Sequence, residues 1–150
     1  MVGMISPRDE KFYEMAAHIL KNIDNPELSR SMTRSLIKEL CTFFSVSKPK
    51  VHFTKHPPKT CFDKDGKQLY SAVYRNFFYL DGKVEKHRLD TNSITFYNFN
   101  PYLSTICHEF THHLQVKHIG FASECEDHVF GTLCVMKRAL KILDRMYIEK

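Results

Sequence analysis

The chain has 150 residues, 43% of them hydrophobic and 26% charged, with a formal net charge of +5, which is typical of one globular domain over residues 1–150. No signal peptide is recognisable and no apolar run approaches the length that spans a bilayer, so we expect no membrane partner. The five cysteines form no C-x-x-C pair, which argues against a zinc ribbon or a disulfide framework and favours a reducing, cytoplasmic or intracellular setting.

Two helices are predicted in the first 44 residues. Ser6-Pro7 is typical of a capped helix start, and this first helix is expected to run to about Asn22. The second is expected to begin at Asn25-Pro26 and to reach about Phe44, because its apolar residues recur at helical spacing.

Short strands are predicted through the middle of the chain. They alternate with strong turn signals, among them two adjacent prolines after the first strand and an Asp-Gly pair that is typical of a tight hairpin. The predicted strands are Val51–Phe53, Leu69–Leu80, Lys83–Leu89 and Ser93–Tyr97.

Two more helices are predicted at the C-terminal end. Asn98 to Pro101 supplies a cap residue and a proline suited to a first helical turn, and helical spacing of apolar residues continues to Leu114. A capping box from Ser123 to Glu126 predicts a long closing helix. The order of helices and strands indicates an α+β domain with its helices on one side of a twisted sheet.

The stretch from His108 to His112 reads H-E-x-x-H and lies within the first of these C-terminal helices. Two histidines four residues apart project from the same helical face, and neutral imidazoles are good zinc ligands. Glu109 lies beside the expected metal without having to bind it, so it is placed to act as a general base toward a metal-activated water. This pattern predicts a Zn²⁺ cofactor held by His108 and His112, with Glu109 as the catalytic residue.

A catalytic zinc site needs a third protein ligand. If the last two helices form an antiparallel hairpin that turns near Gly120, the metal lies level with about position 110 and faces a residue near position 130. His128 is the nearest candidate, and we favour it as the third ligand over Glu124, the runner-up. The candidates that remain open are His128, Glu124, His118 and Glu126.

The motif and the late histidine carry a resemblance to known enzymes. The run from His108 to His112 resembles the zincin-type metallopeptidases, and with His128 it is similar to small SprT-like metalloprotease domains. This resemblance implies a zincin-like fold with N-terminal helices, a small twisted, mainly antiparallel sheet, the motif helix and a long closing helix. It also implies that Ser93–Tyr97 is an edge strand to which a substrate peptide adds.

Two other zinc-protease patterns are similar to parts of this sequence. The run from His108 to His118 resembles the metzincin spacing, with Gln115 in place of its glycine. Glu124-x-x-x-His128 resembles the gluzincin pattern, with histidine in place of aspartate, and in that interpretation Glu124 would bind the metal.

The resemblance implies a hydrolase, a zinc-dependent endopeptidase acting on a peptide or protein substrate. The alternative is a non-catalytic, zinc-containing binding module for nucleic acid or a protein partner. Lysines gather in the middle of the chain and are compatible with nucleic-acid association through basic loops, but we favour a solvated loop and strand surface because no aromatic-interleaved binding motif accompanies them. These lysines are Lys48, Lys50, Lys55, Lys59, Lys64 and Lys67.

Overall fold

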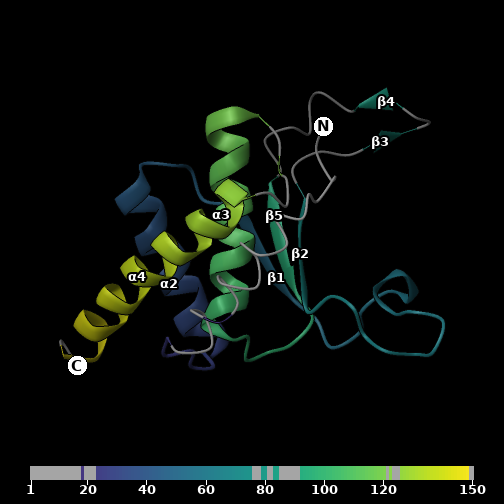
Figure 1. Cartoon of the computed structure of the whole chain (residues 1–150), viewed down its shortest axis with the longest axis horizontal. Helices are drawn as coiled ribbons and strands as arrows, with labels where there is room; N and C mark the ends of the chain where they lie inside the picture. The colour runs from purple at the N-terminus through teal and green to yellow at the C-terminus, as the bar shows by residue number, and fades with distance from the viewer. Residues whose placement is uncertain are drawn as a thin grey trace.

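The computed structural model describes residues 18, 23–75, 79–80, 83–84, 92–120, 122 and 126–148. The first predicted helix, residues 6–22, lies outside the described residues apart from His18. The elements, labelled as in Figure 1, are α2 (Arg30–Phe44), β1 (Lys50–Phe53), the short 3₁₀ helix η1 (Lys59–Cys61), β2 (Ala72–Arg75), β3 (Tyr79–Leu80), β4 (Lys83–Val84), β5 (Ser93–Phe96), α3 (Leu103–Ile119) and α4 (Glu126–Ile148).

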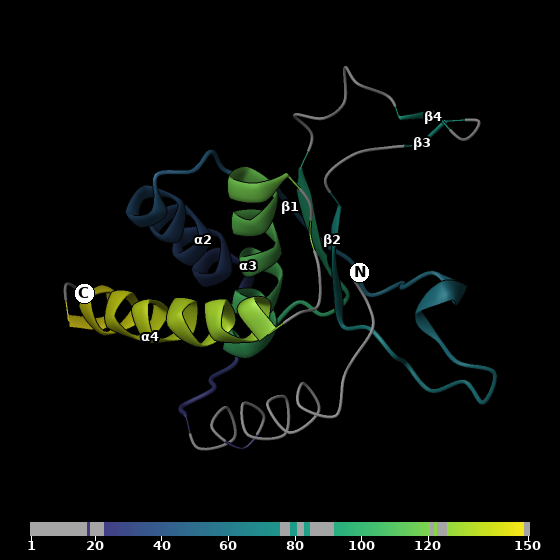
Figure 2. The same ribbon diagram turned by 45° about the horizontal axis from the view of Figure 1, so that its top comes forward.

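The three described helices lie on one side of the sheet, with α3 between the sheet and the other two helices (Figure 2). The predicted α+β architecture is therefore confirmed. The hydrophobic core fills the space around α3 and draws side chains from every layer. Its fully buried members include Leu36, Phe96, Ile106, Phe110 and Met136.

The main sheet has the strand order β1-β5-β2. β1 pairs with β5 in parallel, with Val51 opposite Ile94, whereas β2 pairs with β5 in antiparallel fashion, with Ala72 opposite Phe96. The sheet is therefore mixed, and the expectation of a mainly antiparallel sheet is wrong for these three strands. The expectation that Ser93–Tyr97 forms a sheet edge is also wrong, because β5 is the central strand and its Ile94 and Phe96 are fully buried.

A second, two-stranded sheet is the predicted hairpin. Tyr79 pairs with Val84 and Leu80 with Lys83, so residues 81–82 connect the strands as the Asp-Gly signal predicts. The long strand predicted over residues 69–80 is described as two separate strands, β2 and β3. The part of the predicted third strand beyond Val84 lies outside the described residues.

The helix predicted from Asn25 begins later, at Arg30, where the Ser29 hydroxyl accepts a hydrogen bond from the Met32 amide. Asn25 caps a different helix: its side-chain oxygen accepts from the backbone N–H of Ser104 at 2.7 Å, at the start of α3. The Pro26 carbonyl accepts from the Leu103 amide in the same way. The cap predicted at residues 98–101 is therefore wrong, and a distant loop supplies the acceptors that the first turn of α3 needs.

The closing helix α4 is confirmed, and most of its predicted capping box, residues 123–125, lies outside the described residues. α4 crosses α3 instead of running antiparallel beside it, so the assumed helical hairpin is wrong (Figures 1 and 2). The first turns of α4 nevertheless pack against the motif region of α3. None of the helices in the described part of the chain is both long and apolar enough to cross a membrane.

Candidate metal centre

The middle turns of α3 carry the predicted motif. His108 and His112 are separated by one helical turn, and their ring centroids lie 4.9 Å apart with the rings nearly perpendicular. The Glu109 carboxylate lies beside the first histidine, with 3.9 Å between Glu109 Oε1 and His108 Nε2. The predicted helix therefore brings two imidazoles and one carboxylate together.

The first turn of α4 brings a third imidazole to this pair. The His128 ring lies 4.5 Å from that of His108 and is stacked on that of His112 at 4.0 Å between centroids. One nitrogen from each ring lies within 4.8 Å of the others. These three side chains can therefore hold a metal ion, although the role of His128 as a ligand stays a prediction.

The centre is enclosed on one side and open on the other. His112 and His128 are buried, whereas 39% of the His108 side chain is exposed. His108 and Glu109 line a cleft of about 420 Å³, whose opposite wall is the segment from Leu69 to Ala72 that leads into β2. A small molecule or an extended chain can therefore reach the carboxylate and the outermost imidazole.

Hydrogen bonds orient two of the three rings. His112 Nδ1 lies 2.9 Å from Gln115 Oε1, and an N–H donated there leaves Nε2 as the ligand atom of His112. His128 Nε2 lies 3.1 Å from the backbone oxygen of His108, and donation to this carbonyl leaves Nδ1 as the ligand atom of His128. Partners of this kind fix the tautomer and raise the basicity of a metal-binding histidine.

The remaining sequence candidates for the third ligand do not join the cluster or fall outside the description. His118 is exposed on the last turn of α3 and is not part of the group. Glu124 lies outside the described residues, and the side chain of Glu126 is not described. Gln115 was not predicted to be an orienting group, although its position three residues after His112 places it on the same helical face.

His113, the residue after His112, is not part of the metal cluster and is not a surface group. Its ring is fully buried, with Nδ1 2.9 Å from the Tyr74 hydroxyl and Nε2 2.7 Å from the Ser47 carbonyl oxygen. Burial, together with the positive charge of Lys117, lowers the pKa of His113 against the opposing effect of the Ser47 hydrogen bond. The neutral ring donates to Ser47 and accepts from Tyr74, which ties α3 to β2 and to the loop before β1.

The donor set suits a divalent transition metal. A tetrahedral zinc ion bound at about 2.0–2.1 Å holds its ligand nitrogens roughly 3.4 Å apart. The ligand nitrogens lie within 4.8 Å of one another, so side-chain rotation needs to bring them closer by at most about 1.4 Å. Three imidazoles suit zinc, copper, iron and nickel, so the ligands alone do not select the metal.

No family model, no curated protein and no solved structure matches the chain. The resemblance to zincin-type and SprT-like metalloproteases therefore depends on the motif residues and on the clustering of the three histidines.

Proposed function

We propose that the protein is a zinc-dependent endopeptidase in which His108, His112 and His128 hold the metal and Glu109 is the general base. The observation that carries this proposal is the convergence of three imidazoles beside a carboxylate at the wall of an accessible cleft. The candidate metal ligands, the carboxylate of Glu109 and the cleft therefore meet at one turn of α3.

The number of ligands favours a catalytic over a structural metal. Structural zinc sites are closed by four protein ligands, whereas catalytic sites use three and leave one position for water or substrate. Within the described residues, this cluster contains three potential ligand side chains, and the most exposed of them faces the cleft. A purely structural site would not require a carboxylate at position 109.

When bound, zinc would polarise a substrate carbonyl and lower the pKa of a water molecule toward neutrality. Glu109 takes a proton from the water molecule as the water oxygen attacks the carbonyl carbon. Glu109 then delivers that proton to the amide nitrogen as the carbon–nitrogen bond breaks. The second proton of the water also passes to the leaving amine, so that the products are a carboxylate and a protonated amine. His108 and Glu109 line the cleft, so a peptide bond that binds there would lie beside both side chains.

We place the substrate along β2. In the described three-stranded sheet, β2 is the edge strand on the side of the centre, and the segment that leads into it forms the wall opposite Glu109. An extended peptide can add to such an edge through main-chain hydrogen bonds. This assignment replaces the one made for β5, which has a neighbour on each side.

The test compares wild type with Glu109→Gln in the hydrolysis of casein and of a quenched fluorescent peptide library, with bound zinc measured in parallel. The amide keeps the shape of the side chain but removes its basicity, so we expect metal content to stay near wild type and hydrolysis to fall by about 10²–10⁴-fold. Equal cleavage by the two proteins would contradict the role of Glu109.

Stoichiometric zinc without hydrolysis by the wild-type protein would instead favour the alternative, a zinc-containing binding module. Failure of the wild-type protein to bind zinc, with less than about a tenth of an equivalent after purification without chelators, would contradict both functions.

A further inference from the structure

A second pocket adjoins the metal cleft at one end of the main sheet. Its volume is about 770 Å³, which lies within the range of sites that bind small ligands. The segment from Leu69 to Ser71 lines both this pocket and the cleft that contains Glu109. On the basis of the proposed peptidase function, we further propose that the second pocket binds an acidic side chain of the substrate. Peptides with a glutamate or aspartate a few residues from the scissile bond are then the preferred class of substrate.

The strand order places the second pocket on the path of a peptide that adds to β2. β1 is parallel to β5 and β2 is antiparallel to it, so the residues that follow β1, those that follow β5 and those that precede β2 meet at one end of the sheet. These residues, Lys55, 97–100 and 68–71, line the pocket. A peptide that runs along β2 past the cleft therefore reaches the second pocket as it leaves the sheet.

Helix geometry gives the separation between the second pocket and the catalytic carboxylate. Asn100 lines the pocket, and α3 begins shortly after it at Leu103. From Leu103 to Glu109 the helix rises about 9 Å. An extended peptide advances about 3.3 Å per residue, so the acidic side chain is expected about three residues from the scissile bond. An acidic side chain at the scissile bond itself would instead be repelled by Glu109.

The second pocket carries a positive charge and no negative one. Lys55 is the only charged residue among the nine described residues that line it. Lys55 Nζ lies 4.8 Å from the centre of the Phe99 ring, and the Arg30 guanidinium lies over the same ring at 4.5 Å. Two cations therefore approach one aromatic ring, and within the described part of the chain neither forms an ion pair with a carboxylate. A carboxylate that enters the pocket would supply this missing counter-charge.

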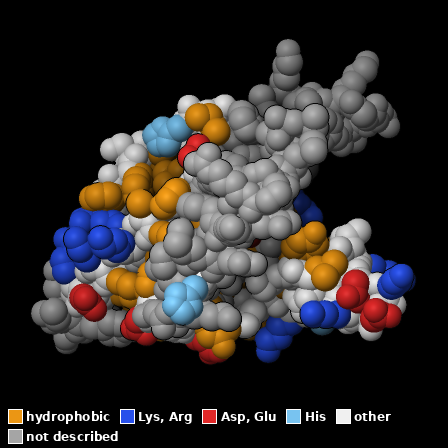
Figure 3. Space-filling model, viewed as in Figure 1, with side chains coloured by type: hydrophobic (Ala, Val, Ile, Leu, Met, Phe, Trp, Pro, Cys, Tyr) orange, Lys and Arg blue, Asp and Glu red, His pale blue; other side chains and the backbone are white. Residues whose placement is uncertain are grey.

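Two acidic residues precede the second pocket in the sequence, but they do not neutralise Lys55. Asp63 and Asp65 lie on the loop that carries η1, where lysines stand among them. Figure 3 shows basic and acidic side chains side by side on this loop, at the lower right. The Asp63 carboxylate accepts hydrogen bonds from the backbone N–H groups of Asp65 and Lys67, both at 2.9 Å. Asp63 is therefore held within its own loop.

Tyr97 connects the second pocket to the metal centre. Its backbone N–H donates to the Ser71 carbonyl at 2.9 Å, which joins two walls of the pocket. Burial raises the pKa of the Tyr97 hydroxyl, as does its hydrogen bond with Cys61, and the negative charge of Glu109 adds to this rise against the opposing charge of Arg75. The electrostatic influence of Glu109 thus extends to the pocket wall, as expected of two sites that one peptide occupies together.

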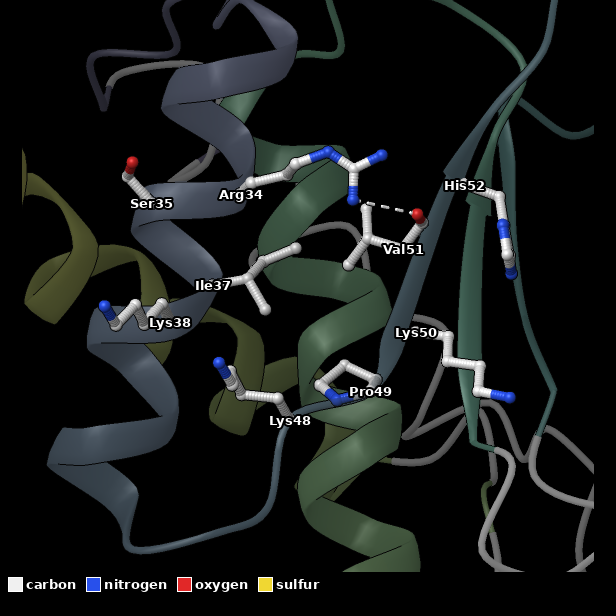
Figure 4. Close-up of a pocket in the computed structure, with 9 residues that line it drawn as sticks. All are labelled: Arg34, Ser35, Ile37, Lys38, Lys48, Pro49, Lys50, Val51 and His52. Atoms are coloured by element: carbon white, nitrogen blue, oxygen red, sulfur yellow. Dashed lines mark hydrogen bonds between the residues drawn. The ribbon is translucent and has the colours of Figure 1, made fainter.

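The opposite end of β1 provides a matched control for Lys55. Lys50 is the first residue of β1, beside a groove between α2 and β1 in which Arg34 Nη1 donates to the Val51 carbonyl at 3.1 Å. Figure 4 shows the charged end of Lys50 turned away from this groove. Lys50→Gln and Lys55→Gln remove the same charge from the two ends of one strand. A difference between the two variants therefore reports the position of the charge, because the net charge is equal.

The experiment measures the affinity of three labelled peptides for the full chain in the presence of zinc. The peptides share one alanine–serine sequence and carry glutamate, glutamine or lysine at the same central position. Every protein in this series contains Glu109→Gln, so that peptides bind without being cleaved. We expect the glutamate peptide to bind about three- to tenfold more tightly than the glutamine peptide, as one charged contact at a partly exposed site allows.

Lys55→Gln should reduce the ratio of these two affinities to less than about twofold, because the charged contact is lost. Lys55→Glu should turn the preference toward the lysine peptide, and Lys50→Gln should keep the original ratio. Both lysines are exposed, so the substitutions are not expected to unfold the protein, and urea unfolding checks this.

Equal affinity for the glutamate and glutamine peptides while Lys55 is present, or equal effects of Lys50→Gln and Lys55→Gln, would overturn the assignment of the pocket. Tighter binding of a leucine peptide than of the glutamate peptide would also overturn it, because an apolar site would then be indicated. Binding does not depend on hydrolysis, so a glutamate preference without any cleavage by the wild-type protein would contradict the peptidase function alone.

Mass spectrometry of the glutamate peptide after digestion by the wild-type protein locates the cleaved bond. We expect this bond about three residues from the glutamate. Cleavage next to the glutamate would overturn the proposed position of the substrate.

Discussion

The backbone of Gly131 on α4 lies so close to Thr111 on α3 that a Cβ atom added at position 131 would fall 2.8 Å from Thr111 Cγ2. Two carbon atoms do not pack at that distance, so the two helices can approach in this way only if residue 131 lacks a side chain. Thr111 precedes His112, and Gly131 follows His128 by three residues. The close approach therefore brings the third imidazole to the two on α3.

We predict that Gly131→Ala weakens both the fold and the metal centre. At an exposed helix position this change would stabilise the protein by up to about 1 kcal/mol. Here the added methyl group forces α3 and α4 apart, so we expect a loss of about 1–3 kcal/mol in the free energy of unfolding, together with weaker zinc binding. Urea unfolding and zinc titration against a chelating dye measure the two effects.

The matched control combines Gly131→Ala with Thr111→Ser. Serine lacks Cγ2 but keeps the hydroxyl that donates to the Cys107 carbonyl at 2.7 Å. The double variant is expected to recover most of the lost zinc affinity. A Gly131→Ala protein that binds zinc like the wild type would show that helix separation does not govern the centre.

His128→Ala should lower zinc affinity by more than about 100-fold, because loss of a metal ligand costs more than the 10–100-fold typical of an orienting partner. His118→Ala is the control, since His118 is exposed on the same helix as the motif and lies outside the cluster. We expect the zinc affinity of the His118→Ala variant to equal that of the wild type. The reverse order of the two variants would assign the third ligand to His118.

Gln115→Ala is predicted to lower zinc affinity by about 10–100-fold through the orientation of His112. Gln115 Oε1 holds His112 Nδ1 at 2.9 Å, and alanine leaves that nitrogen without this acceptor. Gln115→Glu keeps an acceptor oxygen and should bind zinc about as tightly as the wild type. Unchanged affinity in the alanine variant would rule out this role.

Burial raises the pKa of Cys41 to about 11, against the opposing charges of Lys48 and Lys117. The folded protein therefore keeps this thiol protonated at pH values where the unfolded chain, with a pKa near 9.0, ionises. The contribution of the Cys41 thiol to stability is complete below its pKa in the unfolded chain and is lost as the pH rises through its pKa in the folded protein. We expect the free energy of unfolding to fall between pH 9 and 11, with this group contributing up to about 1.4 kcal/mol per pH unit.

Urea unfolding over this pH range compares the wild type with Cys41→Ser, which should decline less steeply. Cys134→Ser, at an exposed position of α4, is expected to keep the wild-type slope. Parallel curves for all three proteins would mean that Cys41 does not ionise differently in the two states.

Local patterns predicted the elements that carry the centre. Helical spacing located α3, and the i, i+4 rule put His108 and His112 on one face because both depend only on neighbouring residues. The position of His128 was predicted from an antiparallel hairpin that does not exist. His128 was nevertheless found at the cluster, because the first turn of α4 meets the middle of α3 before the helices diverge.

Long-range relationships were the ones that local patterns missed. The cap of α3 comes from Asn25, 79 residues before Ser104, so no local pattern indicates it. The central place of β5 follows from pairing with strands on both sides, whereas its own sequence specifies only which side chains are buried. The close contact at Gly131 likewise depends on how two helices meet.

The most direct test of the central claim is an anomalous-scattering map, collected at the zinc absorption edge, from crystals of the protein purified without chelators. We expect a single strong peak within bonding distance of one nitrogen each of His108, His112 and His128, with the Glu109 carboxylate beside it and not bound to it. A map with no peak there, or with the three rings turned to different surroundings, would contradict the central claim.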